Sequence, residues 1–259
     1  MNAGNIRSWH TTHAGTKRKH NEDTFVDRPD LGVWAVADGA GGHQAGEVAS
    51  AMIADALSGL GATLSGAELI EAVRTRMMET HDALRGEAAK RGGNAMIAST
   101  LVTLLARDGY FACLWAGDSR AYLLRDGTLR QITRDHSLVQ ELVDAGTIPE
   151  AEAEAHPHAN VITRAIGADV GELVLDKVSG VLQAGDRFLL CSDGLSKCVP
   201  AARLELILGS DLTETSPSQV LIDAALELNA SDNVTAVAIA IGAGDETGGM
   251  LDESDETIR

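Results

Sequence analysis

The stretch Trp34-Ala-Val-Ala-Asp-Gly-Ala-Gly-Gly-His43 decides the fold prediction, because a strand, a turn and a helix meet in it. The apolar run from Val33 to Ala37 indicates a buried strand, and this run ends at the carboxylate of Asp38. A glycine-rich turn follows, and a helical pattern begins near Gln44. A carboxylate in such a turn can coordinate a metal, take part in proton transfer or cap the coming helix.

The composition of the 259-residue chain suits a single β-rich or mixed domain. Hydrophobic residues make up 44% of the chain but aromatic residues only 3%, so aliphatic side chains must fill the core. The net charge of −17 argues against nucleic acid or an anionic membrane as the main partner. No apolar run approaches the roughly 20 residues of a membrane span, and no signal-peptide pattern is found. Three scattered cysteines indicate reduced thiols, and we expect a cytoplasmic monomer.

Helical and strand-like patterns occur in blocks along the chain. Helical periods over Gln44–Leu60 and Ala67–Arg91 are followed by short apolar runs, at Ser99–Ala106, Tyr110–Ala116, Arg120–Arg125 and Thr128–Ile132. Asp-Gly pairs between these runs predict hairpins, so we expect an antiparallel meander. Later helices are expected at Asp135–Ala145, Pro200–Leu208 and Pro217–Leu228, and later strands at Leu173–Val178, Arg187–Cys191 and Val234–Ile241.

This arrangement favours an α+β fold of stacked antiparallel sheets covered by helices, rather than a parallel sheet. Residues 147–167 are expected to be an insert. Residues 1–242 would form the domain, and the acidic residues 243–259 a disordered tail.

Acidic side chains stand at the ends of the predicted strands. Asp38, Asp118 and Asp193 follow buried strands, and Asp232 stands just before the last one. Because the end of one antiparallel strand and the start of its neighbour share an edge, these carboxylates can meet at one rim, with Glu22-Asp23 beside them. Carboxylates about 4 Å apart repel one another by an energy on the order of several kcal/mol, so they either protonate or hold a cation.

The ligand type indicates which cation would bind. Oxygen ligands suit Mg²⁺ or Mn²⁺, and no Cys/His spacing indicates zinc. A single Asp-Gly pair is more often a turn than a ligand, and Asp126-Gly127 is interpreted as a plain hairpin turn. The metal centre is predicted from all of these acidic residues taken together, in their order along the chain, and not from any one Asp-Gly pair.

From about Gly15 to Ile241, the sequence resembles the metal-dependent serine/threonine protein phosphatase family, the type-2C or PPM class, in its bacterial form. The segments that carry the resemblance are Arg18-Lys-His-Asn-Glu-Asp23, Asp38-Gly-Ala-Gly-Gly-His43 with Gly46-Glu47, Gly117-Asp-Ser-Arg120, Thr133-Arg-Asp-His-Ser137, Asn160-Val-Ile-Thr-Arg-Ala-Ile-Gly167, Ser192-Asp-Gly-Leu195 and Asp232-Asn233. The resemblance implies a four-layer α-β-β-α sandwich with two Mn²⁺ or Mg²⁺ ions at one rim.

The resemblance also implies how the two ions are held. By analogy, Asp38 bridges them and Gly39 adds its backbone carbonyl. Asp193 and Asp232 bind the first ion, and Glu22 binds the second.

The remaining implied roles concern water, a further ion and the substrate. Asp23 would orient water on the metal, and Asp118 with Asp193 would form the third metal site of bacterial members. Arg18 would hold the substrate phosphate, because its fork of donors suits a phosphate dianion. Residues 137–167 would form a mobile flap.

The resemblance implies a hydrolase that removes phosphate from phosphoserine and phosphothreonine in proteins and opposes a bacterial Ser/Thr kinase. A water shared by two metal ions has a lowered pKa and can attack phosphorus in line, without a covalent intermediate. The alternatives are a non-catalytic phosphoprotein-binding module of the same fold and a phosphatase for small molecules. A cysteine phosphatase is disfavoured, because four residues rather than five separate Cys198 from Arg203.

One departure from the family concerns the general acid. Some members carry a His directly after the Asp-Gly pair, but Ala40 stands there in this chain. His43 is interpreted as lining the turn or capping the helix, and His136 as structural. Arg164 is interpreted as an anchor of the flap.

Overall fold

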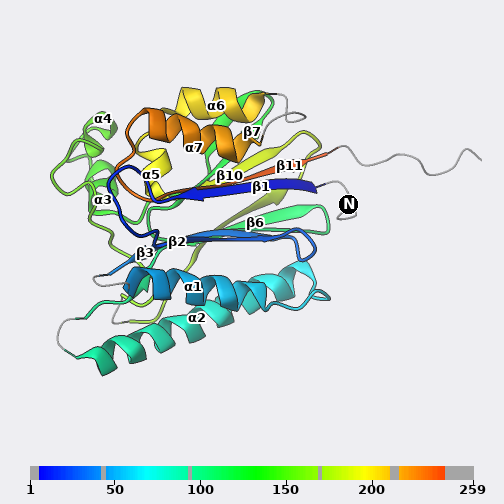
Figure 1. Cartoon of the computed structure of the whole chain (residues 1–259). Helices are drawn as coiled ribbons and strands as arrows, with labels where there is room; N and C mark the ends of the chain where they lie inside the picture. The colour runs from blue at the N-terminus through cyan, green and yellow to red at the C-terminus, as the bar shows by residue number, and fades with distance from the viewer. Residues whose placement is uncertain (1–5, 42–44, 93–94, 169–170, 211–215, 243–259) are drawn as a thin grey trace, which may run out of the picture.

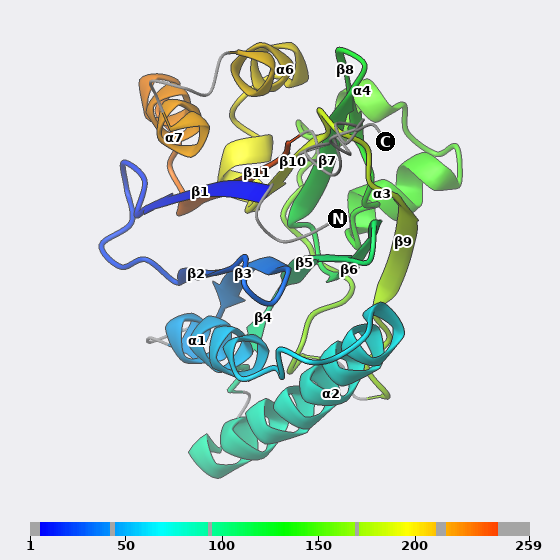
Figure 2. The same ribbon diagram turned by 90° about the vertical axis from the view of Figure 1, so that its right-hand side faces the viewer.

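A computed structural model describes residues 6–41, 45–92, 95–168, 171–210 and 216–242. Two antiparallel sheets lie face to face between two layers of helices (Figure 1). Figure 2 shows the same layers from the end, with α6 and α7 on one outer side and α1 and α2 on the other. The predicted α-β-β-α sandwich is confirmed.

The first sheet has the strand order β1-β11-β10-β7-β8. Its strands are β1 (Ile6–His13), β11 (Val234–Ile241), β10 (Arg187–Cys191), β7 (Arg120–Arg125) and β8 (Thr128–Gln131). Three helices cover its outer face, namely α5 (Asp193–Ser196), α6 (Ala201–Gly209) and α7 (Pro217–Glu227). Pro217 occupies the first turn of α7, where its missing N–H costs nothing.

The second sheet has the order β2-β3-β5-β6-β9, with β4 also paired to β3. Its strands are β2 (Asp23–Arg28), β3 (Val33–Ala40), β4 (Ala98–Ser99), β5 (Leu101–Arg107), β6 (Tyr110–Ala116) and β9 (Asp176–Val181). Helices α1 (Ala45–Ser58) and α2 (Gly66–Arg91) cover it. A capping box of Ser65 and Glu68 begins α2.

Strand β3 is apolar at successive positions because both of its faces are buried. Val33, Ala35 and Ala37 pack toward α1 and α2. Trp34 and Val36 point to the other face and pack between the two sheets. There Phe188 of the first sheet meets Phe111 of the second, with ring centroids 5.1 Å apart. The strand that carries Asp38 is therefore packed on both of its faces.

The expected meander is wrong as a single unit. β5 and β6 form a hairpin in the second sheet, whereas β7 and β8 form a hairpin in the first. The chain crosses between the sheets at Gly117, whose φ of 114° suits glycine alone. The two Asp-Gly turns are hairpins as predicted, with positive φ at both turn residues.

Several element boundaries differ from the expected ones, and two differences are larger than the rest. The helix expected from Asp135 begins only at Leu138 (α3, Leu138–Asp144), because the Ser137 side chain accepts the Gln140 N–H and caps it there. The strand expected at Leu173–Val178 is β9, which begins at Asp176. The insert contains the single-turn helix α4 (Glu150–Ala153).

Two expectations concern the ends of the chain and the membrane. Residues 243–259, the expected tail, lie outside the described residues. In the described part of the chain, no helix combines the length and the apolar character that crossing a membrane requires.

Candidate metal centre

Five aspartates from both sheets gather at the end of the sandwich where α3 and α4 lie, the left-hand end in Figure 1. Asp23 begins β2 directly opposite Asp38 of β3. Asp118 follows β6, Asp193 begins α5 after β10, and Asp232 precedes β11. The prediction placed them on the edge of one sheet, but the rim is formed by the edges of two stacked sheets.

The negative charges at this rim act on one another. The pKa of Asp38 is raised well above its ordinary value by burial and by the charges of Asp23, Asp193, Asp118 and Asp232. The structure therefore brings the predicted aspartates close enough for mutual repulsion. Such a cluster favours any cation that can enter it.

Asp23 is held by hydroxyl groups from the other sheet. Ser192 Oγ and Thr235 Oγ1 each donate a 2.7 Å hydrogen bond to Asp23 Oδ2. Burial raises the pKa of Asp23 to about 7, although these two hydrogen bonds act to lower it. Its other oxygen, Oδ1, is buried and has no hydrogen-bond partner among the described residues. The sequence analysis missed Ser192 and Thr235 as supports.

Glycines allow the backbone of β3 to approach Glu22 and α1 closely. A Cβ on Gly39 would lie 2.2 Å from the Gly46 carbonyl oxygen, and one on Gly46 would lie 2.7 Å from the Gly39 oxygen and 2.9 Å from Glu22 Cδ. The Gly39 N–H donates to the Glu22 carbonyl oxygen at 3.2 Å. Two predicted metal ligands, Glu22 and the Gly39 carbonyl, therefore share one narrow space.

Asn233 fastens the loop that carries Arg18 and Glu22. Its side-chain oxygen accepts the Glu22 N–H at 2.8 Å, and its side-chain nitrogen donates to the carbonyl oxygens of Ala14 and His20. Arg18 then reaches the rim, where Nη2 donates to Asp232 Oδ2 at 2.7 Å. This hydrogen bond is the largest reason why the pKa of Arg18 is raised. The Arg18 side chain is 56% exposed, so an arriving phosphate can reach it.

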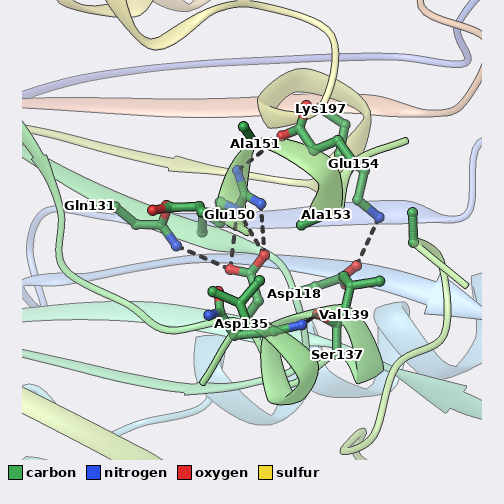
Figure 3. Close-up of a pocket in the computed structure, with 14 residues that line it drawn as sticks. Asp118, Gln131, Asp135, Ser137, Val139, Glu150, Ala151, Ala153, Glu154 and Lys197 are labelled. Atoms are coloured by element: carbon green, nitrogen blue, oxygen red, sulfur yellow. Dashed lines mark hydrogen bonds and ion pairs between the residues drawn. The ribbon is translucent and has the colours of Figure 1, made fainter. Parts of the chain in front are cut away.

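Lys197 is a member of the centre that the sequence analysis missed. Its ammonium lies 2.7 Å from Asp193 Oδ2 and 3.1 Å from Asp118 Oδ2. Figure 3 shows Lys197 and Asp118 joined in this way at the side of a cavity that α3 and α4 help to line. Burial raises the pKa of Asp118 to about 6, although Lys197 acts to lower it. The i,i+4 spacing from Asp193 to Lys197 was the available signal.

His136 and Arg164 support the scaffold, as interpreted. The Gly117 N–H donates to His136 Nδ1 at 3.1 Å, and His136 Nε2 lies 3.2 Å from Asp176 Oδ2 and 3.1 Å from Arg164 Nη1. Arg164 Nη1 donates to Asp176 Oδ1 at 2.7 Å and so ties the insert to β9. His43 lies outside the described residues.

Residues 12–243 match the family described as Protein phosphatase 2C. The chain belongs to this family. That result confirms the predicted family and the predicted class of enzyme, serine/threonine phosphatases. It favours neither the non-catalytic module nor the small-molecule phosphatase.

Two relatives of this protein in the 2C family are named as serine/threonine phosphatases. The serine/threonine phosphatase stp of Listeria innocua is 35% identical over 235 residues, which are 88% of this chain and 93% of that protein. The serine/threonine protein phosphatase PstP of Mycobacterium tuberculosis is 37% identical over 86% of this chain, which is 42% of its own length.

Solved structures of the family share the fold. PppA, described as a key regulatory component of T6SS in Pseudomonas aeruginosa, superposes with a TM-score of 0.83 at 41% identity, covering 91% of this chain and 97% of that one. The catalytic domain of PstP in complex with two manganese ions gives a TM-score of 0.79 at 34% identity, covering 92% and 99%.

The 2C family is metal-dependent, and the residues of this chain fit a divalent cation. The raised pKa of Asp23, its unpartnered oxygen Oδ1 and the close approach of Gly46 to Gly39 and Glu22 suit hard cations with oxygen ligands. Within the described ranges, however, no three His, Cys, Asp or Glu side chains are arranged to hold an ion alone. Main-chain oxygen and water would therefore complete the coordination.

Proposed function

We propose that this protein is a phosphoprotein phosphatase that uses two Mn²⁺ or Mg²⁺ ions to hydrolyse phosphoserine and phosphothreonine. The observation that carries the proposal is the gathering of four aspartates from two sheets around the half-buried Asp38. Such a cluster disfavours its own ionisation and is neutralised by divalent cations. The family membership supports the reaction type.

The proposed ligands are distributed over both sheets. Asp38 would serve both ions, with the Gly39 carbonyl beside it. Asp193 and Asp232 would help to hold the first ion, and Glu22 the second. When bound, the two ions lower the pKa of a shared water and so provide the nucleophile at neutral pH.

The chain's own residues bind and orient the substrate. Arg18 exchanges its contact with Asp232 for the phosphate oxygens, which its planar fork of donors matches. Asp23 accepts hydrogen bonds at Oδ2 and directs Oδ1 inward, where it can orient a water. Ala40 cannot donate a proton, so the leaving serine or threonine oxygen must be protonated by another group at the centre.

We further propose that the partners are phosphorylated proteins, including a cognate Ser/Thr kinase and its substrates, met in the cytoplasm by a monomeric phosphatase domain of residues 1–242. Residues 137–167, which include α3 and α4, would form the substrate-facing flap. PppA of Pseudomonas aeruginosa, which shares this fold, is described as a key regulatory component of T6SS, so a regulatory role is compatible with the fold.

The experiment is release of phosphate from a phosphothreonine peptide with and without Mn²⁺. Asp38→Asn and Asp193→Asn should abolish turnover, with losses of roughly a thousandfold or more, as for other groups that stabilise the transition state directly. Asp126→Asn, in the hairpin turn between β7 and β8, is the matched control and should keep full activity. Turnover that is independent of metal, or that persists in Asp38→Asn, would contradict the proposal.

A further inference from the structure

Lys197 stands at the place where the two sheets bring their carboxylates together. It is the C-cap residue of α5, and its N–H donates to the Asp193 carbonyl oxygen at 2.9 Å. One helical turn therefore brings its side chain back over the Asp193 carboxylate, next to Asp118 from the other sheet.

The Lys197 ammonium has all three of its hydrogen bonds satisfied. The acceptors are Asp193 Oδ2 at 2.7 Å, Asp118 Oδ2 at 3.1 Å and Asn160 Oδ1 at 3.1 Å. Asn160 belongs to the insert, so one charged group joins α5, the β6 end and the insert. The side chain is only 22% exposed, which makes this a built site rather than a surface contact.

The Lys197 ammonium occupies the space between the Asp193 and Asp118 carboxylates. A divalent ion such as Mg²⁺ binds carboxylate oxygens at about 2.1 Å. The same two Oδ2 atoms cannot serve that ion while the ammonium holds both of them.

We propose that Lys197 takes the place of a divalent cation between Asp118 and Asp193, and that it fastens the insert to the centre through Asn160. This inference rests on the proposed two-ion centre. It replaces the third ion that the sequence resemblance implied with a positive charge that belongs to the chain. Lys197 is then a positioning residue for Asp193 and for the insert.

The test is a count of bound Mn²⁺ per chain by equilibrium dialysis and elemental analysis at saturating Mn²⁺. Wild type should bind two ions, whereas Lys197→Met, which keeps the length but loses the charge, should bind three. Lys197→Gln provides a second variant in case Lys197→Met does not fold, and it should also bind three. Equal counts in wild type and either folded variant overturn the proposal.

Two further variants separate charge from tethering. Lys177→Met, which removes an exposed lysine on β9, should bind two ions as wild type does. Asn160→Ala should also bind two ions, but amide hydrogens of residues 156–163 should exchange roughly tenfold faster, because a hydrogen bond to a charged group is lost. Unchanged exchange in Asn160→Ala overturns the tether.

The experiments distinguish a failure of the proposed role of Lys197 from a failure of the proposed phosphatase function. A wild-type protein that neither binds Mn²⁺ nor turns over phosphopeptide ends both proposals. An active, two-ion wild type whose Lys197→Met variant also binds two ions ends only the role of Lys197.

Discussion

Asp23 shows how the burial of one carboxyl group at the rim affects the stability of the folded state. Its pKa is raised to about 7, mainly by burial, so its folded-state pKa lies above its unfolded value of about 3.9. Below the unfolded value both states are protonated and the group has no effect on stability. As the pH rises from there through the folded value, ionisation increasingly favours the unfolded state.

In the metal-free protein, Asp23→Asn should therefore increase the free energy of unfolding, and the increase should depend on pH. In EDTA, the variant should gain stability relative to wild type as the pH rises from about 4 to about 8. Each pKa unit is worth about 1.4 kcal/mol, so the gain is on the order of a few kcal/mol. Urea unfolding at several pH values measures it. A stability difference that stays flat across this range would show that the pKa is not raised.

Arg18 should affect substrate binding rather than metal binding. Removing its donors in Arg18→Ala costs a charged hydrogen bond to phosphate, so KM for a phosphopeptide should rise roughly 10- to 100-fold. The number of bound Mn²⁺ ions should stay unchanged. Lys17→Ala, next in the chain, is the control and should leave KM as in wild type. If Arg18→Ala bound fewer Mn²⁺ ions than wild type, the main role of Arg18 would instead be to position Asp232.

At the scale of elements, the approach of β3 to the first turn of α1 depends on missing side chains. A Cβ on Gly46 would meet the Gly39 backbone and the Glu22 carboxyl group within 3 Å. Gly46→Ala should therefore destabilise the protein by about 1–3 kcal/mol and weaken Mn²⁺ binding. Gly86→Ala, where no atom lies within 4 Å inside α2, should instead stabilise it by about 0.4–1 kcal/mol. Thermal melts and Mn²⁺ titrations of both variants check the contrast.

The sequence predicts elements well where local signals are strong. The apolar run before Asp38, the Asp126-Gly127 turn and Pro217 each carry their own physical reason for a strand, a hairpin or a helix start. The meander failed because β6 and β7 look like neighbouring strands, and nothing local says that Gly117 takes the chain to the other sheet. Lys197 was missed because its partners Asp118 and Asn160 are distant in sequence.

At the scale of the whole molecule, the geometry of the rim depends on the packing between the sheets. Phe188 is fully buried there, in edge contact with Phe111 of the opposite sheet. Phe188→Ala should cost about 3–5 kcal/mol and also weaken Mn²⁺ binding, because the aspartates come from both sheets. Tyr110→Ala, at a position that is 61% exposed, should change the stability by less than about 1 kcal/mol. Unfolding by urea and calorimetric Mn²⁺ titration of each variant give both quantities.

Strand β11 is an interior strand of its sheet, although it is the last strand of the described chain. It lies between β1 and β10. Just before it, Asp232 accepts a hydrogen bond from Arg18 at the rim, and Asn233 Oδ1 accepts the Glu22 N–H. A polypeptide still emerging from the ribosome cannot finish this sheet or its catalytic end until β11 has been released. During synthesis, β1 therefore has no β11 to pair with, and the nascent protein stays inactive until β11 has been made.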